Sequence, residues 1–274
     1  VDERTNGEYK IEIYPNGTLG GESDMLDSMS TGMLDVGIIT SGPFVNFSEM
    51  MGVLDMPYLF ANNEEAYKVL DGEIGRELLD TLEDAGLKGL AYAERGFRNV
   101  TNSVRPVTCA DDLAGLKLRV MENEVYTATF KALKVNAVPM AWAEALTAMQ
   151  QGTIEAQENP LAMIETQSFY EVCPYLILTA HLRAWVYIAM GLAQYERLSD
   201  SQKAVVDQAG AECQAYEHEL FLDNEEKYYN QLQEQGMEFI EVDTDEFAAA
   251  MVSGVLPILT DSQKEIYDAI EALA

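Results

Sequence analysis

Half of the arginines in this chain fall within 25 residues. Of eight arginines, four are Arg95, Arg98, Arg105 and Arg119. The chain around them holds 47 acidic residues against 17 lysines and arginines, which gives a formal net charge of −30. A guanidinium group carries a rigid fork of N–H donors that matches a carboxylate bidentately. Scarce basic groups clustered in this way indicate a site that binds an anion.

Three polar side chains are expected to meet at one edge of a sheet. Arg119 stands two residues before the end of a predicted strand at 116–121, and Arg98 follows a predicted strand at 87–92. Asn159 follows a later strand and precedes Pro160, which favours extended geometry at Asn159. Ligands of open α/β sheets bind beyond the carboxyl ends of the strands. We therefore expect Arg98, Arg119 and Asn159 to converge, although an inter-helix salt bridge is the alternative for Arg119.

Aromatic residues near these positions are candidates for the apolar wall of a pocket. Trp142 opens the helix predicted at 141–151, and Trp185 lies in a long apolar passage at 176–193. Small-molecule pockets are mostly apolar with a few fixed polar groups. Packing in the core is the alternative for both tryptophans. Arg95 and Arg105 receive no role other than bracing the structure.

Several classes of function are excluded or disfavoured. The acidic excess argues against nucleic acid and against an anionic membrane surface as partner. No apolar run approaches the roughly 20 residues that span a bilayer. Cys109, Cys173 and Cys213 show neither metal-ligand spacing nor a disulfide framework. His181 and His218 stand far apart, and no motif of hydrolases, zinc proteases or nucleotide-binding loops occurs, so we predict no enzyme, no metal site and no cofactor.

The first residues suggest that the chain begins within an element. Residues 1–6 followed by Gly7 are typical of a helix end with a glycine cap. Residues 9–14 alternate apolar and polar side chains, which predicts a half-buried strand. A helix that feeds a strand at this point leads us to expect a further strand and most of a helix upstream.

From residue 21 to residue 160 the predicted helices and strands follow one another closely, and from residue 115 they alternate regularly. This order predicts an α/β fold with a largely parallel sheet. The predicted helices are 21–31, 62–70, 74–85, 123–133 and 141–151, and the predicted strands are 34–40, 87–92, 116–121, 135–139 and 154–157. Asn62 or Asn63 is the expected cap of the second of these helices, and Asn123 is the expected cap of the fourth. Asn159-Pro160 is expected to open another helix, with proline at its first position.

The last third of the chain predicts long elements that cross between two lobes. Residues 176–193 are apolar and rich in strand-forming residues. Ser199 and Gln202 form the pattern of a capping box, and the helix that follows runs to about residue 235, which makes it about 54 Å long. A helix of this length exceeds one small domain. We assign residues 1–96 plus about 185–224 to lobe I, and about 97–184 plus 225–274 to lobe II.

Several long motifs resemble one family of transport proteins. The strings are GFRNVTNSVRP (96–106), DDLAGLKLRVMENEVY (111–126), PMAWAEALTAMQQGTIEAQENP (139–160) and FYEVCPYL (169–176). They resemble the solute-binding proteins of TRAP transporters, in the branch that includes dicarboxylate and sialic acid binders, and the resemblance runs from Glu3 to the end. It implies a periplasmic, two-lobed α/β protein that closes on a ligand and hands it to a membrane permease driven by a sodium gradient. Such a protein is expected to act as a monomer without a cofactor.

The resemblance also implies roles for individual residues. The carboxylate-binding arginine of the family matches Arg119 in LKLRV, and its second ligand-side arginine matches Arg98 in GFRNV. The asparagine of its QENP motif matches Asn159, and the aromatic residue at a helix start matches Trp142. Glu49 matches, more weakly, a position that contacts polar ligand tails in some members. Ala156, Cys173 and Glu124 depart from the family pattern, but none of them touches the arginine.

We therefore predict an extracytoplasmic protein that captures an organic acid with an arginine clamp. The alternatives are a periplasmic sensing module of a signalling system, built on the same fold, and an α/β enzyme. The sequence does not separate transport from sensing. Trp142 and Trp185 suggest a pocket that holds a ring, which favours sugar acids or aromatic acids over acids of the size of succinate.

Overall fold

One mixed sheet of seven strands organises the molecule. The structure is a computed structural model that describes residues 1–273, apart from the side chains of Leu222 and Asp223. The strand order is β1-β6-β2-β5-β3-β4, and β7 pairs with β6. The strands are β1 (Val36–Thr40), β2 (Leu87–Asn102), β3 (Lys117–Val120), β4 (Asn136–Pro139), β5 (Ala156–Pro160), β6 (Tyr175–Gly191) and β7 (Glu238–Ile240).

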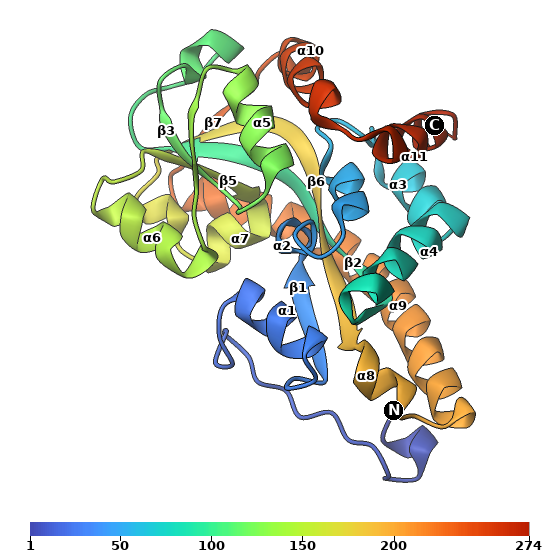
Figure 1. Cartoon of the computed structure of the whole chain (residues 1–274). Coiled ribbons are helices and arrows are strands. Elements are labelled where there is room, and N and C mark those ends of the chain that lie inside the picture. The colour runs from blue at the N-terminus through green and yellow to red at the C-terminus, as the bar shows by residue number, and fades with distance from the viewer. Residues whose placement is uncertain (274) are drawn as a thin grey trace.

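Two long antiparallel strands and one long helix join the two lobes. Strands β2 and β6 pair along most of their length and run side by side from one lobe into the other (Figure 1). Helix α9 (Asp200–Glu234) has 35 residues, a length of about 52 Å, and begins with the predicted capping box of Ser199 and Gln202. It lies against β2, where the backbone N–H of Tyr92 donates to Gln214 Oε1 over 2.8 Å. The two-lobed α/β fold with crossing strands is confirmed.

Most predicted helices form, and their predicted caps are present. Asn62 caps α3 by accepting from the N–H of Glu65, and Asn123 caps α5 by accepting from the N–H of Val125. Gly86 ends the segment after α4 in the left-handed conformation that favours glycine. The helices are α1 (Glu22–Ser30), α2 (Ser41–Phe44), α3 (Asn63–Leu70), α4 (Glu73–Asp80), α5 (Glu124–Ala132), α6 (Trp142–Gln150), α7 (Leu161–Thr166), α8 (Leu192–Glu196), α10 (Thr244–Val255) and α11 (Asp261–Glu271).

The prediction of a largely parallel sheet is wrong. Strand β3 pairs parallel with β4 and β5, as the alternating pattern after residue 115 indicates. However, β6 pairs antiparallel with β1 and β2, and β2 pairs antiparallel with β5. The long strands pass through both lobes in opposite directions, so they join the parallel part of the sheet as antiparallel neighbours.

The strand predicted at residues 9–14 does not form. Within the described residues this segment has no ladder partner, and the side chains of Ile11 and Ile13 are 62% and 83% exposed. Alternation of apolar residues stabilises a strand only where a neighbouring strand and a core surface receive it. The segment lies along the outside of the molecule, near α1 and β1 (Figure 1).

Separate hydrophobic cores underlie the two lobes. One core consists mainly of buried residues from the sequence range 26–92, and it includes Trp185 and Tyr187. Two others gather residues of α5, α6, β3 and β5, with Phe247 of α10 and Leu232 of α9. Ile270 of α11 packs in the first core, although the predicted division assigns 225–274 to lobe II. We propose to keep the other predicted boundaries and to assign α11 to lobe I.

Candidate functional site

A cavity opens where the two lobes meet. Its empty space is about 320 Å³, including the part that is open to solvent. Helix α1 and strand β1 supply one side of it, and β2, β3, β5, α6 and α7 supply the other. The lining residues are Glu22, Thr40, Arg95, Arg98, Arg119, Met121, Trp142, Asn159 and Met163. The structure thus brings together four of the predicted site residues, Arg98, Arg119, Trp142 and Asn159.

Arg119 keeps a free donor edge although its side chain is only 3% exposed. Its Nε and Nη2 donate to the carbonyl oxygen of Met140 over 2.9 and 2.7 Å. These two N–H groups share one edge of the guanidinium plane, so the Nη1–Nη2 edge is left for another acceptor. Burial lowers the pKa of Arg119 to about 10, so the group stays cationic at neutral pH. Its guanidinium carbon lies 5.7 Å from the centre of the Trp142 ring.

Arg98 is already paired within the protein. Its Nε and Nη2 contact the carboxylate of Glu158, with 2.8 Å between Nη2 and Oε1, and both side chains are at most 1% exposed. Burial disfavours the charge of Arg98, but the Glu158 carboxylate raises the pKa of Arg98 above its ordinary value. Likewise, Arg98 and His181 overcome burial and hold the pKa of Glu158 below its ordinary value. Arg98 therefore lines the cavity as half of a neutralised pair.

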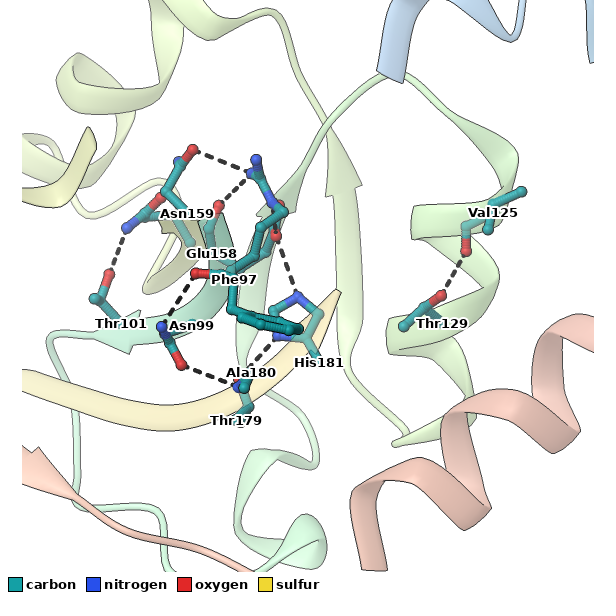
Figure 2. Close-up of polar contacts among 12 residues, drawn as sticks. Phe97, Asn99, Thr101, Val125, Thr129, Glu158, Asn159, Thr179, Ala180 and His181 are labelled. Carbon is teal, nitrogen blue, oxygen red and sulfur yellow. Dashed lines mark hydrogen bonds and ion pairs between the residues drawn. The ribbon is translucent and has the colours of Figure 1, made fainter. Parts of the chain in front are cut away.

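Asn159 belongs to a chain of hydrogen bonds that fixes Arg98. Its Oδ1 accepts from Arg98 Nη2 over 3.1 Å, and its Nδ2 donates to Gln157 Oε1. Gln157 in turn donates to Thr101 Oγ1 over 2.6 Å. Figure 2 shows this chain beside the pair of Glu158 and His181. Both polar ends of the Asn159 amide are thus engaged within the protein.

The expected position of Arg98 and Asn159 beyond strand ends is wrong. Both lie inside strands, because β2 runs to Asn102 and β5 runs to Pro160. Pro160 is the N-cap of α7 and not its first residue. The two strands extend further than predicted because they pair with each other, with Arg98 opposite Pro160 and Asn99 opposite Asn159.

Arg95 lines the cavity as a third arginine, which the sequence did not indicate. It is the extra residue of an irregularity in β2, where Glu94 pairs with Trp185 and Gly96 pairs with Ala184. The carboxylate of Glu94 accepts from the backbone N–H groups of Arg95 and Gly96 over 3.0 and 2.6 Å. Glu94 two residues before Gly96 could have signalled this irregularity, but acidic residues are too common in this chain for the pattern to be informative.

Arg105, the last of the clustered arginines, has a structural role. It is remote from the cavity lining, and its guanidinium donates to the backbone carbonyls of Asp112 and Ala114 over 2.7 to 3.0 Å. These bonds tie the segment after β2 to the segment before β3. The expectation that Arg105 braces the structure agrees with these contacts.

Glu22 is the one acidic residue among those that line the cavity. Its Oε1 accepts from the hydroxyl and the backbone N–H of Thr40, over 2.6 and 3.1 Å. No hydrogen bond engages its Oε2 within the described residues. Glu22 stands in the first turn of α1, after Gly20 and Gly21, and the sequence offered no reason to single it out.

Trp185 and Glu49 lie outside the cavity, which corrects their assignment to the site. Trp185 is fully buried in the core, where its ring meets Phe60 edge-on at 6.3 Å and Arg183 at 5.2 Å. Glu49 is exposed at the start of a 3-10 helix (Glu49–Asp55), and its carbonyl accepts from Gln263 over 2.6 Å. The alternation of β6 turns Trp185 towards the core of lobe I, and α11 covers the backbone at Glu49.

The charges of the cavity suit a small anion. Arg98 is neutralised by Glu158, so Arg95 and Arg119 stand against the single charge of Glu22, and the lining has an excess of one positive charge. Among the side chains that the structure describes, there is no group of three or more that could hold a metal ion. The described helices also include none that is long and apolar enough to cross a membrane.

The sequence is similar to that of known solute-binding proteins. The family described as bacterial extracellular solute-binding protein, family 7, matches residues 1–265. The 2,3-diketo-L-gulonate-binding periplasmic protein YiaO of Escherichia coli (strain K12) is 34% identical over 275 residues, which cover 100% of this chain and 84% of that protein.

Solved structures agree with the sequence comparison. A TRAP periplasmic solute-binding protein from Polaromonas, bound to D-erythronate, is 36% identical with a TM-score of 0.95, covering 99% of this chain and 90% of that one. Another from Roseobacter denitrificans, with bound L-galactonate, is 34% identical with a TM-score of 0.92, covering 99% and 89%. The chain belongs to family 7 of the bacterial extracellular solute-binding proteins.

Proposed function

We propose that this protein binds a sugar acid in the periplasm and delivers it to a TRAP-type membrane permease. The carboxylate of the ligand binds the free edge of Arg119, and the carbon chain extends through the cavity past Trp142. The observation that carries the proposal is the buried Arg119, whose Nη1–Nη2 edge has no acceptor among the described residues although the group lines a cavity. Such a cation is costly without an anionic partner.

The binding energy requires more than the carboxylate. A hydrogen bond to a charged group contributes about 1.5–3 kcal/mol, whereas micromolar affinity corresponds to about −8 kcal/mol. Contact of the ligand with Trp142, Met121 and Met163 removes apolar surface from water. The remaining stabilisation comes from closure of the lobes over the ligand. Closure needs tighter contacts in the closed state than in the open state, and needs no stabilised transition state.

The architecture supports closure of this kind. Glu22 and Thr40 belong to α1 and β1, while Arg119, Trp142 and Asn159 belong to the other side of the cavity. The two sides are joined by β2, β6 and α9 (Figure 1). Domains that close around a ligand turn about a few such connecting segments. A ligand held by both sides therefore links its own burial to the position of the lobes.

The ligand class follows from the cavity and from similar proteins. D-erythronate and L-galactonate are the bound ligands of the similar structures from Polaromonas and Roseobacter denitrificans. Both are monocarboxylates with several hydroxyl groups. A lining with one excess positive charge and several polar donors and acceptors matches this chemistry. The expectation of a ring-shaped ligand loses its support from Trp185, because that side chain lies in the core.

A thermal-shift panel tests the ligand class. Purified protein is heated separately with aldonates, uronates, dicarboxylates, amino acids and neutral sugars. All compounds are used at the same concentration, in the millimolar range. We expect stabilisation by sugar acids, and none by the neutral sugars that lack a carboxylate. A ligand at 100 times its Kd raises the free energy of unfolding by about 2.7 kcal/mol, which such an assay resolves. Stabilisation by a neutral sugar alone would contradict the carboxylate clamp.

A further inference from the structure

Resting on the function proposed above, we propose that Arg95 and Glu22 together select the tail of the ligand, so that the protein prefers polyhydroxylated monocarboxylates to the corresponding dicarboxylates. In this proposal Arg119 binds the carboxylate of the ligand. Arg95 and Glu22 form hydrogen bonds with the hydroxyl groups at the other end of the ligand. Neither residue touches the Arg98–Glu158 pair through a hydrogen bond in the described structure.

The backbone aims Arg95 into the cavity. Extra residues in strands occur beside functional sites, where they redirect a side chain. Glu94 holds the irregularity by accepting from the N–H groups of both residues that follow it, and its carboxylate is paired with the buried Arg183. The backbone N–H of Glu94 donates to Glu217 of α9 over 2.5 Å. These four contacts around Glu94 fix the backbone where β2 passes between the lobes, and they thereby fix the direction of the Arg95 side chain.

Arg95 has unused donors at that position. The one hydrogen bond that its guanidinium makes in the described structure joins Nη2 to the sulfur of Met163, at 3.1 Å. A thioether sulfur is a weak acceptor, and none of the described carboxylates lies within ion-pair distance of Arg95. Burial lowers the pKa of Arg95, and the negative charge of Glu22 offsets only part of that effect. A ligand oxygen would restore a proper acceptor.

Glu22 supplies the complementary function. Thr40 holds one of its oxygens with two hydrogen bonds, so the carboxylate has a fixed direction and a second oxygen without a partner in the described structure. A ligand hydroxyl both donates and accepts, so one such group, or two adjacent ones, can satisfy Glu22 and Arg95 together. A carboxylate at that end can only accept, and it would meet the like charge of Glu22. The pair therefore favours hydroxyl groups.

Charge counting gives the same preference. Three charged side chains of the lining, those of Arg95, Arg119 and Glu22, form no ion pair within the described residues, and their charges add up to plus one. One ligand carboxylate brings this total to zero, whereas two bring it to minus one. Since like charges in a partly buried cavity repel more strongly than in water, the second carboxylate is unfavourable. Substitution of Glu22 by glutamine should remove most of this penalty.

Calorimetric titration tests the inference with ligands matched in carbon number. The pairs are erythronate with tartrate, and galactonate with galactarate. The comparison uses the pair whose aldonate binds the wild type more tightly. We expect this aldonate to bind at least about tenfold more tightly than the dicarboxylate of the same pair. Glu22→Gln should reduce this ratio about tenfold. Arg95→Met, which keeps length without charge, should weaken the aldonate by about 10–100-fold, the range of a charge-assisted hydrogen bond.

Controls separate this inference from the proposed function and from misfolding. Arg197→Met changes an exposed arginine whose side chain makes no hydrogen bond or ion pair within the described residues, and it should leave affinity unchanged. Arg95→Lys keeps the charge and should recover part of the affinity, while thermal unfolding without ligand shows whether each variant folds. Equal or tighter binding of the dicarboxylate, or an Arg95→Met affinity within twofold of the wild type, would overturn the inference. If aldonate binding is nevertheless lost in Arg119→Ala, the proposed function survives that result. If neither aldonate binds the wild type, the inference is overturned, and the proposed function then depends on the response to other sugar acids.

Discussion

The buried pair of Arg98 and Glu158 predicts a large effect from a small change, Glu158→Gln. The substitution keeps the size of the side chain and one acceptor oxygen, but it removes the only anion that contacts Arg98 in the described structure. Arg98 is 1% exposed, so water can compensate the uncovered charge only in part. His181, whose Nε2 lies 3.2 Å from Glu158 Oε2, loses an anionic partner as well.

The size of this effect follows from the burial of both partners. Removing one partner of a buried ion pair costs about 3–5 kcal/mol, because an uncompensated charge stays behind. We expect the free energy of unfolding of Glu158→Gln to fall by that amount. A change of about 0–1 kcal/mol would be typical of an exposed pair. The predicted loss is thus several times larger than for a pair such as Lys134 with Asp111, whose side chains are 76% and 85% exposed.

The substitution should also change the acid dependence of stability. The folded-state pKa of Glu158 is lowered, so its contribution is present above the ordinary glutamate pKa of about 4.3 and is lost as the pH falls through the folded-state pKa. Glu158→Gln lacks this group and should show a smaller loss of stability in acid than the wild type. The two unfolding curves should therefore approach each other below about pH 4.

Urea unfolding at pH 7 and at lower pH measures both effects. Glu171→Gln is a matched control, since Glu171 is exposed and its side chain makes no hydrogen bond or ion pair within the described residues. The double variant Arg98→Met with Glu158→Leu removes both charges and should recover much of the stability at pH 7. A loss below about 1 kcal/mol in Glu158→Gln, equal to that of Glu171→Gln, would refute the assignment of this pair as a buried, mutually dependent unit.

Two further predictions concern stability away from the cavity. Asp55 is fully buried, and burial raises its pKa to about 7, although Ser41 and Asn123 donate hydrogen bonds to it. A raised folded-state pKa gives stability that is lost as the pH rises from about 4 to 7. Asp55→Asn should therefore remove this loss, which a comparison of the urea midpoints at pH 5 and pH 8 measures. The same pH dependence in Asp55→Asn as in the wild type would argue against this account. Gly75→Ala would place a Cβ atom 2.2 Å from the carbonyl oxygen of Leu70, so a loss of about 1–3 kcal/mol in thermal unfolding is expected, and no loss would show that the backbone yields freely.

The sequence predicted best where local signals and pairing agree. The caps at Asn62, Asn123 and Ser199 depend on hydrogen bonds between neighbours in the chain, and all three form. The strand predicted at 9–14 depends on a partner, and it fails because the described residues supply none. The lengths of β2 and β5 likewise depend on their pairing with each other, which single-strand patterns do not contain.

The candidate site divides in the same way. Arg119 was identified from its place in a strand and from the resemblance, and it lines the cavity with a free donor edge. Arg95 was missed because its direction depends on an irregular pairing between β2 and β6. Glu158 was missed because a buried counter-ion looks like any other acid in a chain with 47 of them. Trp185 was misplaced because alternation along β6 does not say which face meets the cavity.

Titration calorimetry of Arg119→Ala tests the central claim most directly. With the sugar acid that stabilises the wild type most, Arg119→Ala should show an affinity lower by at least about 10–100-fold. Arg119→Lys should fall between the two, because a point charge cannot replace a bidentate fork. The thermal midpoint without ligand should change little in Arg119→Ala, since the substitution removes a buried charge that forms no ion pair within the described residues. An unchanged affinity in a folded Arg119→Ala variant would contradict the account.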